Sequence, residues 1–172
     1  MHHFSFMARF SAWVNDRFYP HVAELDAASY RAPAGLFFGS IHATLNHILI
    51  VDRLWTGRVK GVDRGVRALD QVLHDDLASL RAARKEEDAS LIQFMDGLSE
   101  ADLQARVRYK TVTGDTKREM EARVWDMLTG LYNHQTHHRG QVYALLLQKG
   151  IKLPDIDVIY YLHETGQARF LD

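Results

Sequence analysis

The chain contains no cysteine among its 172 residues. This absence excludes disulfide bonds, zinc sites with thiolate ligands and a thiol nucleophile supplied by the chain itself. Any thiol chemistry at this protein therefore needs a thiol that arrives from outside.

Long apolar runs and a strong net charge are absent as well. No apolar run approaches the roughly 18 residues that a membrane span requires, and the first residues lack the basic stretch of a signal peptide. The net charge is −1, and lysine and arginine are spread along the chain, so neither a nucleic-acid surface nor a membrane surface is expected. We therefore expect a cytoplasmic protein without nucleic-acid or membrane partners.

What is present is the composition of a globular protein, with 47% hydrophobic and 25% charged residues. No repeat, low-complexity segment or linker divides the chain, and its length suits one domain with a real core. We predict a single domain over residues 1–172.

Apolar residues recur at helical spacing in four long segments. These segments run from about Phe4 to Leu25, Ser40 to Val59, Leu69 to Leu98 and Ala122 to Lys149. Ser40 and Gly61 fit the cap and the stop of the second helix, and Pro20 should kink the first or split off its last turn. The third includes a highly charged stretch, 81–88, which predicts a solvated helix surface.

Four amphipathic helices of this length predict an all-α fold, and favour an antiparallel four-helix bundle. The long connection from about Gly57 to Leu69 leaves strict up-and-down connectivity open.

Two smaller elements are expected around the last long helix. Before it, Val107, Tyr109 and Thr111 alternate and a turn follows at 113–115, which predicts a short β-hairpin. After it, the tail should form a short helix near Asp155 to His163.

The most informative stretch is His134-Gln-Thr-His-His138, followed by Arg139-Gly140-Gln141, within the fourth predicted helix. Histidines four apart lie one turn above the other on one face, so their rings can converge. With His134 at zero on a helical wheel, His138 falls at about 40°, in the middle of the apolar stripe, and His137 at about 300°, outside it. Two imidazoles therefore point into the core, where they need hydrogen bonds or a metal ion.

A mononuclear metal site normally takes a third protein ligand, and helix bundles draw such ligands from facing helices. The candidate histidines on other segments are His21, His42, His47, His74 and His163. His47 is favoured, because it lies midway along its helix beside the apolar face, whereas His42 is close to the helix start and His74 has acidic neighbours. The alternative is a set of hydrogen-bonded core histidines without a metal.

In combination these motifs resemble the DinB-like (damage-inducible, DinB/YfiT) superfamily. The resemblance is carried by Ser40-Ile-His-Ala-Thr-Leu-Asn-His47-Ile-Leu-Ile-Val-Asp52-Arg-Leu-Trp55, Asn133-His134-Gln-Thr-His-His138-Arg-Gly-Gln141, Ala12-Trp13-Val14-Asn15 and the strand around Tyr109. It spans nearly the whole chain. It implies a four-helix bundle with a three-histidine divalent metal site at His47, His134 and His138, and a homodimer. One departure is Gly130, where many relatives have a further histidine.

Three neutral imidazoles leave a bound ion its full charge and at least one open position. Zinc is the default for such a nitrogen site, with nickel or another first-row metal as the alternative. We expect a metal-dependent enzyme in which a metal-bound water or an exogenous low-molecular-weight thiol attacks a small electrophilic substrate. The resemblance implies the same, since the better-understood relatives look like transferases or isomerases that use such thiols, and others look like hydrolases. The alternatives are a non-catalytic metal-binding or stress-response module and a structural dimer braced by its metal.

No general acid or base stands out near the motif, so no catalytic residue is assigned. His137 is expected on the helix surface or beside the ligands. Arg139 and Gln141 either orient a ligand or an anionic substrate or make helix–helix hydrogen bonds. Asp52 faces a different direction from His47, which favours a salt bridge.

The large aromatic residues have mainly structural interpretations. Trp13, Trp55 and Trp125 are predicted core residues. Tyr132 and Tyr143 either line a pocket or pack in the core or a dimer, and packing is favoured.

Overall fold

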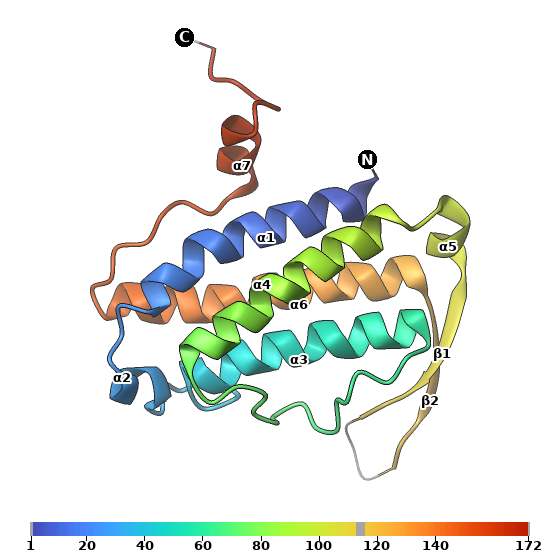
Figure 1. Cartoon of the computed structure of the whole chain (residues 1–172), viewed down its shortest axis with the longest axis horizontal. Coiled ribbons are helices and arrows are strands. Elements are labelled where there is room, and N and C mark those ends of the chain that lie inside the picture. Colours follow the sequence, from blue (N-terminus) through green and yellow to red (C-terminus); the bar gives the residue numbers. More distant parts are fainter. Residues whose placement is uncertain (1, 113–115, 172) are drawn as a thin grey trace.

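Four long helices form a bundle in the structure, a computed structural model that describes residues 2–112 and 116–171 (Figure 1). They are α1 (His3–Val22), α3 (Ile41–Lys60), α4 (Leu77–Asp96) and α6 (Val124–Gln148). The shorter elements are α2 (Ala27–Arg31), α5 (Glu100–Gln104), α7 (Val158–Glu164), β1 (Arg106–Lys110) and β2 (Glu119–Arg123). The predicted all-α four-helix bundle is confirmed. In these described residues, no helix has both the length and the apolar character needed to cross a membrane.

The sequence signals at the two ends of α3 act as predicted. The Ser40 side chain accepts a hydrogen bond from the Ala43 amide at 3.1 Å. Gly61 follows the helix with a φ of 67°, a left-handed conformation that glycine adopts without a steric penalty. Both ends of α3, and with them the position of His47 on it, are therefore set locally.

Proline shapes the end of α1. Pro20 lies in the last turn of the helix, which ends at Val22 rather than at the predicted Leu25. Proline has no amide hydrogen and cannot donate a helical hydrogen bond. The helix thus ends about one turn before the predicted Leu25, in agreement with the expectation that Pro20 splits off the last turn.

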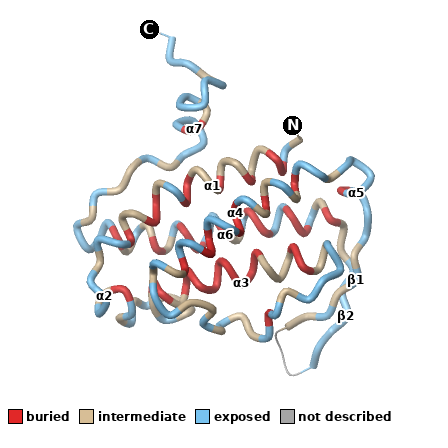
Figure 2. The backbone as a smooth tube through the Cα atoms, in the orientation of Figure 1, coloured by how far each residue is buried: buried red, intermediate tan, exposed pale blue. Residues whose placement is uncertain are grey.

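The hydrophobic core lies between the four long helices, where Figure 2 shows the buried residues concentrated. One cluster includes Phe18, Val22, Leu45, Leu49 and Leu80. A second includes Phe4, Leu91, Met95, Leu128 and Leu131. Burial of each such side chain contributes about 1.5–3 kcal/mol, so these clusters are the main source of stability.

The four helices do not alternate in direction along the chain. In Figure 1, α1 and α6 run one way and α3 and α4 run the other way. The strict up-and-down connectivity that the sequence left open is therefore not adopted, because the segment 61–76 returns along α3 before α4 begins. An extended chain covers roughly 3.3 Å per residue, twice the rise of a helix, so this segment is long enough to make the return.

The helix predicted from Leu69 is wrong for residues 69–76, which belong to this return segment. The side-chain oxygen of Asn46 on α3 accepts hydrogen bonds from the amides of Leu73 and His74 at 2.9 and 3.0 Å. These amides are satisfied by a tertiary contact instead of a helical one. The helix therefore begins only at Leu77, after the segment has been tied to α3.

The charged stretch 81–88 of α4 is only in part the solvated surface that its composition predicts, because Arg81, Lys85 and Glu86 are exposed but its other charged residues are not. Arg84, Glu87 and Asp88 are buried, with exposed fractions of 2%, 3% and 7%. Arg84 forms ion pairs with Asp52 of α3 and with Asp88, the latter at 2.9 Å. The predicted salt bridge of Asp52 is thus confirmed, and the charges of this stretch hold helices together.

The strands β1 and β2 pair antiparallel, with Tyr109 opposite Met120, and the predicted hairpin is confirmed. The predicted turn at 113–115 lies outside the described residues. The ring of Tyr109 lies 5.7 Å from that of Trp55 on α3, so the hairpin closes one end of the bundle.

The C-terminal tail contains the predicted short helix, α7. Its Tyr161 packs against Phe6 and Phe10 of α1, with ring centroids 5.6 Å apart in both pairs. The Tyr143 hydroxyl of α6 donates a hydrogen bond to the Pro154 carbonyl at 3.2 Å. Tyr143 thereby has a packing role, and it helps to tie the tail to the bundle.

The three tryptophans are half-buried, which corrects their prediction as core residues. Trp13 lies under the Arg17 guanidinium, 4.5 Å from the ring centroid, and Trp125 packs edge-on against Phe4 at 4.8 Å. Trp55 lines a cavity. Tryptophan is often too large to be fully enclosed, and here the rings cover the edges of the core.

Candidate metal centre

Three histidines from two neighbouring helices come together. His47 lies midway along α3, and His134 and His138 lie one turn apart on α6, which runs antiparallel beside α3 (Figure 1). The ring centroid of His47 is 4.9 Å from each of the other two. One nitrogen from each ring lies within 4.8 Å of the others. The helical spacing predicted this meeting of His134 and His138, and the packing of α3 on α6 adds His47.

A backbone contact orients His47. Its Nδ1 lies 2.7 Å from the carbonyl oxygen of Leu69, and a carbonyl oxygen only accepts hydrogen bonds. The neutral ring therefore carries its proton on Nδ1 and leaves the Nε2 lone pair free. That Nε2 lies 2.9 Å from Nε2 of His134.

A side-chain amide orients His138 in the same way. Its Nδ1 lies 2.8 Å from Oε1 of Gln141, so Nδ1 donates and Nε2 is free. Of the two roles considered for Gln141, the contact supports orientation of a candidate ligand. Arg139 has the other role, because it donates hydrogen bonds across to α1, to Ser11 at 2.7 Å and to Asn15 at 3.3 Å.

Burial keeps the three imidazoles neutral. Loss of hydration lowers the pKa of His47 to about 4 and the pKa of His134 to about 3. It also lowers the pKa of His138, against the opposing effect of its hydrogen bond to Gln141. At neutral pH the rings can accept a metal ion without first losing a proton.

The group fits a divalent cation. Nε2 of His47 and Nε2 of His134 lie 2.9 Å apart, and two lone pairs at that distance repel unless a proton or a cation lies between them. One shared proton would satisfy one pair of rings, whereas a cation satisfies all three. Nδ1 of His134 is also buried with no hydrogen-bond partner in the described part of the chain. No carboxylate belongs to the group as far as residues 2–112 and 116–171 show, so an ion here would have three protein ligands, the usual number where a position stays open.

The other histidines considered as ligands lie outside the group. These are His21, His42, His74 and His163. His42 bonds through Nε2 to the carbonyl of His74 at 3.0 Å, which fixes the return segment instead. His137 is exposed, and its ring lies beside that of His138 with centroids 4.8 Å apart. The prediction that His137 lies at the surface beside the candidate ligands is therefore confirmed.

A cavity of about 540 Å³ opens beside the three histidines. Its wall is mainly apolar and aromatic, with Phe38 from the connection before α3, Trp55 and Val51 from α3, and Met120 from β2. A small molecule that enters this cavity would lie against the face where the three rings meet.

Among the described residues that line this cavity, Arg58 is the one that carries a full charge. Its guanidinium lies between two aromatic rings, 4.8 Å from the centroid of Trp55 and 4.2 Å from that of Tyr109. It donates a hydrogen bond to the Lys110 carbonyl at 3.1 Å. The stacking holds a positive charge at the cavity wall.

Sequence reasoning missed Phe38, Arg58 and the Leu69 carbonyl. Phe38 stacks on His47 with ring centroids 3.6 Å apart. Phe38 and Leu69 belong to connections between helices, where no periodic pattern marks them. For Arg58 the sequence offers one signal, which is its position one helical turn after Trp55. That signal is weak by itself.

Gly130 marks the departure from the relatives that have a further histidine. It is exposed on α6, and a Cβ at this position would meet no atom within 4 Å. The glycine therefore leaves open space one turn before His134. The three-histidine group is complete without a side chain at this position.

These features define a helical-bundle protein with a small hairpin and a three-histidine group that could hold a metal ion. A sequence model of the DinB family matches residues 1–169, and the chain belongs to this family. Protein DinB of Bacillus subtilis (strain 168) is 25% identical over 169 residues, which cover 91% of this chain and 91% of that protein. The resemblance inferred from the two histidine motifs is thus confirmed.

Gln141→Ala is expected to weaken metal binding by about 10–100-fold, because residues that orient a ligating histidine contribute on this scale. Competition titration of zinc against a chelating dye measures the effect. Gln148→Ala, at the exposed end of the same helix, serves as the control and should bind like the parent. Equal affinities of the two variants would show that Gln141 does not orient His138.

Proposed function

We propose that this protein is a metal-dependent enzyme that binds a divalent ion at His47, His134 and His138 and acts on a small molecule in the adjoining cavity. The observation that carries the proposal is the meeting of three neutral imidazoles, two buried and one half-buried, beside a mainly apolar cavity of about 540 Å³. Small-molecule sites usually combine apolar walls with a few convergent polar groups in this manner.

A divalent ion held by three neutral nitrogens would act as a Lewis acid and lower the pKa of a water or thiol ligand. Zinc is the proposed ion, with nickel as the alternative, because both suit imidazole ligands. The chain lacks cysteine, so a thiol nucleophile would be a second, low-molecular-weight substrate. The reaction is then a thiol transfer, or a hydrolysis where water takes that place.

The proposed substrate is a small electrophile with an apolar body and an anionic group. Trp55 and Tyr109 hold the Arg58 guanidinium at the cavity wall. The single hydrogen bond found for it in the described residues, to the Lys110 carbonyl, leaves further N–H groups for a carboxylate. The aromatic wall would cover the apolar part of the substrate.

A purely structural metal is less well supported. Structural sites are usually closed by four protein ligands, whereas the group in the described residues has three and lies beside a cavity. The same features argue against a metal-braced dimer as the principal role.

The test compares metal-loaded and chelator-stripped protein with a panel of low-molecular-weight thiols, or water alone, and a chromogenic electrophile that carries a carboxylate. We expect turnover that is lost on stripping and restored by the metal. His47→Ala should lose it, and His163→Ala, an exposed histidine on α7, should keep it. If metal-loaded protein shows no metal-dependent turnover with any thiol or with water, the enzyme proposal fails and a non-catalytic metal-binding module replaces it.

A further inference from the structure

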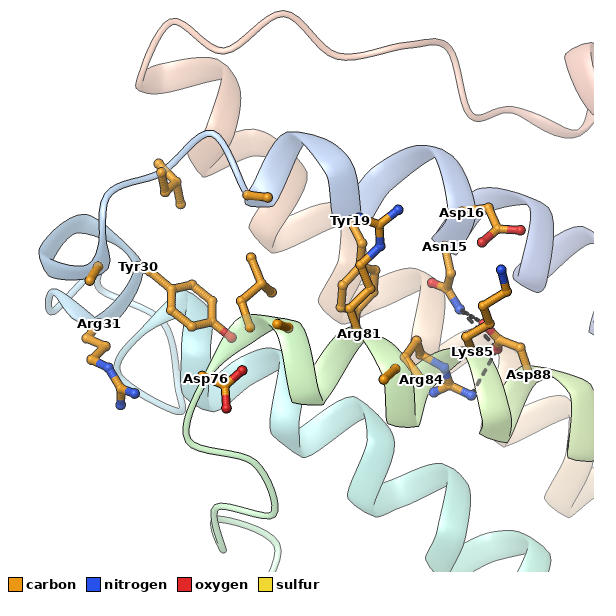
Figure 3. Close-up of a pocket in the computed structure, with 16 residues that line it drawn as sticks. Asn15, Asp16, Tyr19, Tyr30, Arg31, Asp76, Arg81, Arg84, Lys85 and Asp88 are labelled. Carbon is orange, nitrogen blue, oxygen red and sulfur yellow. Dashed lines mark hydrogen bonds and ion pairs between the residues drawn. The ribbon is translucent and has the colours of Figure 1, made fainter.

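A second cavity, of about 720 Å³, lies between α1, α2 and α4 (Figure 3). None of the residues that line it also lines the cavity beside the histidines. In Figure 3, Tyr30 lies at one end of the cavity, and Lys85 and Asp88 lie at the other. The lining runs along α4 from Leu77 to Asp88, which corresponds to about 17 Å of helix. The cavity is therefore elongated and independent of the histidine group.

Two cationic side chains without an ion-pair partner in the described residues lie along the α4 side of this cavity. Arg81 and Lys85 are exposed and one turn apart, and Figure 3 shows both extending from α4 towards α1. Neither forms an ion pair or side-chain hydrogen bond with any residue in the described part of the chain. At the Tyr30 end, Arg31 donates one hydrogen bond to the carbonyl of Asp75. The cavity thus presents cations that the protein itself does not neutralise.

Most of the acidic groups at the cavity are committed to the fold. Asp76 caps α4 and accepts the Ser79 amide at 2.8 Å. Asp88 accepts hydrogen bonds from Asn15 at 3.0 and 3.1 Å and pairs with the buried Arg84. Asp16 is the remaining carboxylate in the lining. Three cations of the lining, Arg31, Arg81 and Lys85, form no ion pair with a carboxylate of the described residues. The balance favours a negatively charged ligand.

Two buried polar groups point to an occupant as well. Tyr30 is 5% exposed, and its hydroxyl has no hydrogen-bond partner in the residues that the structure describes. Nε of Arg84, a residue 2% exposed, has none either. An unmet buried hydroxyl costs about 1–3 kcal/mol, which an oxygen of a bound molecule would offset. Between these groups the wall is apolar, with Leu25 and Leu77 and the ring of Tyr19.

We propose that this cavity is a second binding site, for an elongated organic anion with an apolar body and a polar far end, such as a medium-chain carboxylate with a terminal hydroxyl. The anionic head lies between Arg81 and Lys85. The apolar body follows Tyr19 and Leu77 towards Tyr30, whose hydroxyl bonds to a hydroxyl at the far end of the ligand. The site needs no metal and is distinct from the proposed centre of catalysis.

Isothermal titration of chelator-stripped protein with decanoate tests the proposal without involving the histidine group. Decanoate should bind, and Arg81→Ala/Lys85→Ala should raise its dissociation constant about tenfold, which is the scale of one lost charge-assisted hydrogen bond. Lys152→Ala/Arg169→Ala removes the same charge from exposed positions outside both cavities and should bind like the parent. Tyr30→Phe should weaken the binding of 10-hydroxydecanoate, whose far hydroxyl can reach Tyr30, by a smaller factor, and it should leave decanoate binding unchanged.

Decanol and decyltrimethylammonium serve as neutral and cationic probes of the same length. Both should bind at least tenfold more weakly than decanoate. Binding of either probe as tight as that of decanoate would overturn the proposal. So would an absence of decanoate binding, or an unchanged dissociation constant in Arg81→Ala/Lys85→Ala.

Discussion

Arg84→Ala is expected to lower the free energy of unfolding by about 3–5 kcal/mol, the cost of breaking a buried ion pair from one side. The side chain of Arg84 is 2% exposed and pairs with Asp52 and Asp88. Its truncation leaves the buried carboxylates of Asp52 and Asp88 without their cation. A buried charge without a partner is costly. Urea denaturation followed by circular dichroism measures the change as a lower midpoint.

Arg84 keeps its positive charge in the folded protein although it is buried. Burial acts to lower the pKa of its guanidinium, but the carboxylates of Asp88 and Asp52 outweigh burial and raise that pKa above its ordinary value. The cation is therefore present at every pH at which the protein is folded. Burial raises the pKa of Asp52 to about 6, so the stability lost in the alanine variant should be largest above that pH, where Asp52 keeps its charge, and should shrink as Asp52 is protonated below it.

Arg81→Ala is the matched control, because Arg81 is exposed on the same helix one turn before Arg84. Its effect on the free energy of unfolding should stay within about 0.5 kcal/mol, as for most surface substitutions. The double variant Asp52→Asn/Arg84→Met should recover part of the loss, because fewer charges remain unpaired. Equal stabilities of Arg84→Ala and Arg81→Ala would contradict the structural role of the buried pair.

The buried polar groups next to Arg84 also bear on the histidines. Gln135, adjacent to His134, donates a hydrogen bond to Asp52 at 2.8 Å. Arg139, adjacent to His138, donates to Ser11 of α1. These bonds fix the rotation of α6 about its axis, since a rotated helix would leave buried polar groups unpaired. The two histidines are thereby directed towards α3.

His134→Ala is expected to weaken zinc binding by more than about 100-fold, since loss of a ligand should exceed the 10–100-fold effect of losing a residue that only orients one. The ring centroid of His134 lies 4.4 Å from that of His138 and 4.9 Å from that of His47. With two nitrogens left, the ion would lose one of its three protein ligands. Elemental analysis after gel filtration measures occupancy, and far-ultraviolet circular dichroism checks the fold.

His137→Ala is the control for this experiment, since His137 lies on the same helix outside the group. It should keep the metal occupancy of the parent protein. Full occupancy in His134→Ala would remove His134 from the proposed ligands, and a large loss in His137→Ala would replace the predicted set with another.

Local features of the chain account for much of the architecture. The caps of α3 at Ser40 and Gly61 and the alternation around Tyr109 follow from short-range preferences, and they appear in the structure as predicted. The pairing of His134 with His138 and the exclusion of His137 follow from helical periodicity alone. These features depend on neighbours within a turn or two, which a sequence displays directly.

Long-range packing decided the rest. It made α3 and α4 parallel, turned residues 69–76 into a return segment, and buried Arg84 in a stretch whose composition indicates a surface. It also brought Phe38 onto His47 and placed Arg58 at the cavity wall. By itself the sequence determined the four long helices, the hairpin and the helix faces that carry the histidines. Only the tertiary structure decided how those faces meet, because the burial of a charge or the lining of a cavity depends on side chains that are distant along the chain.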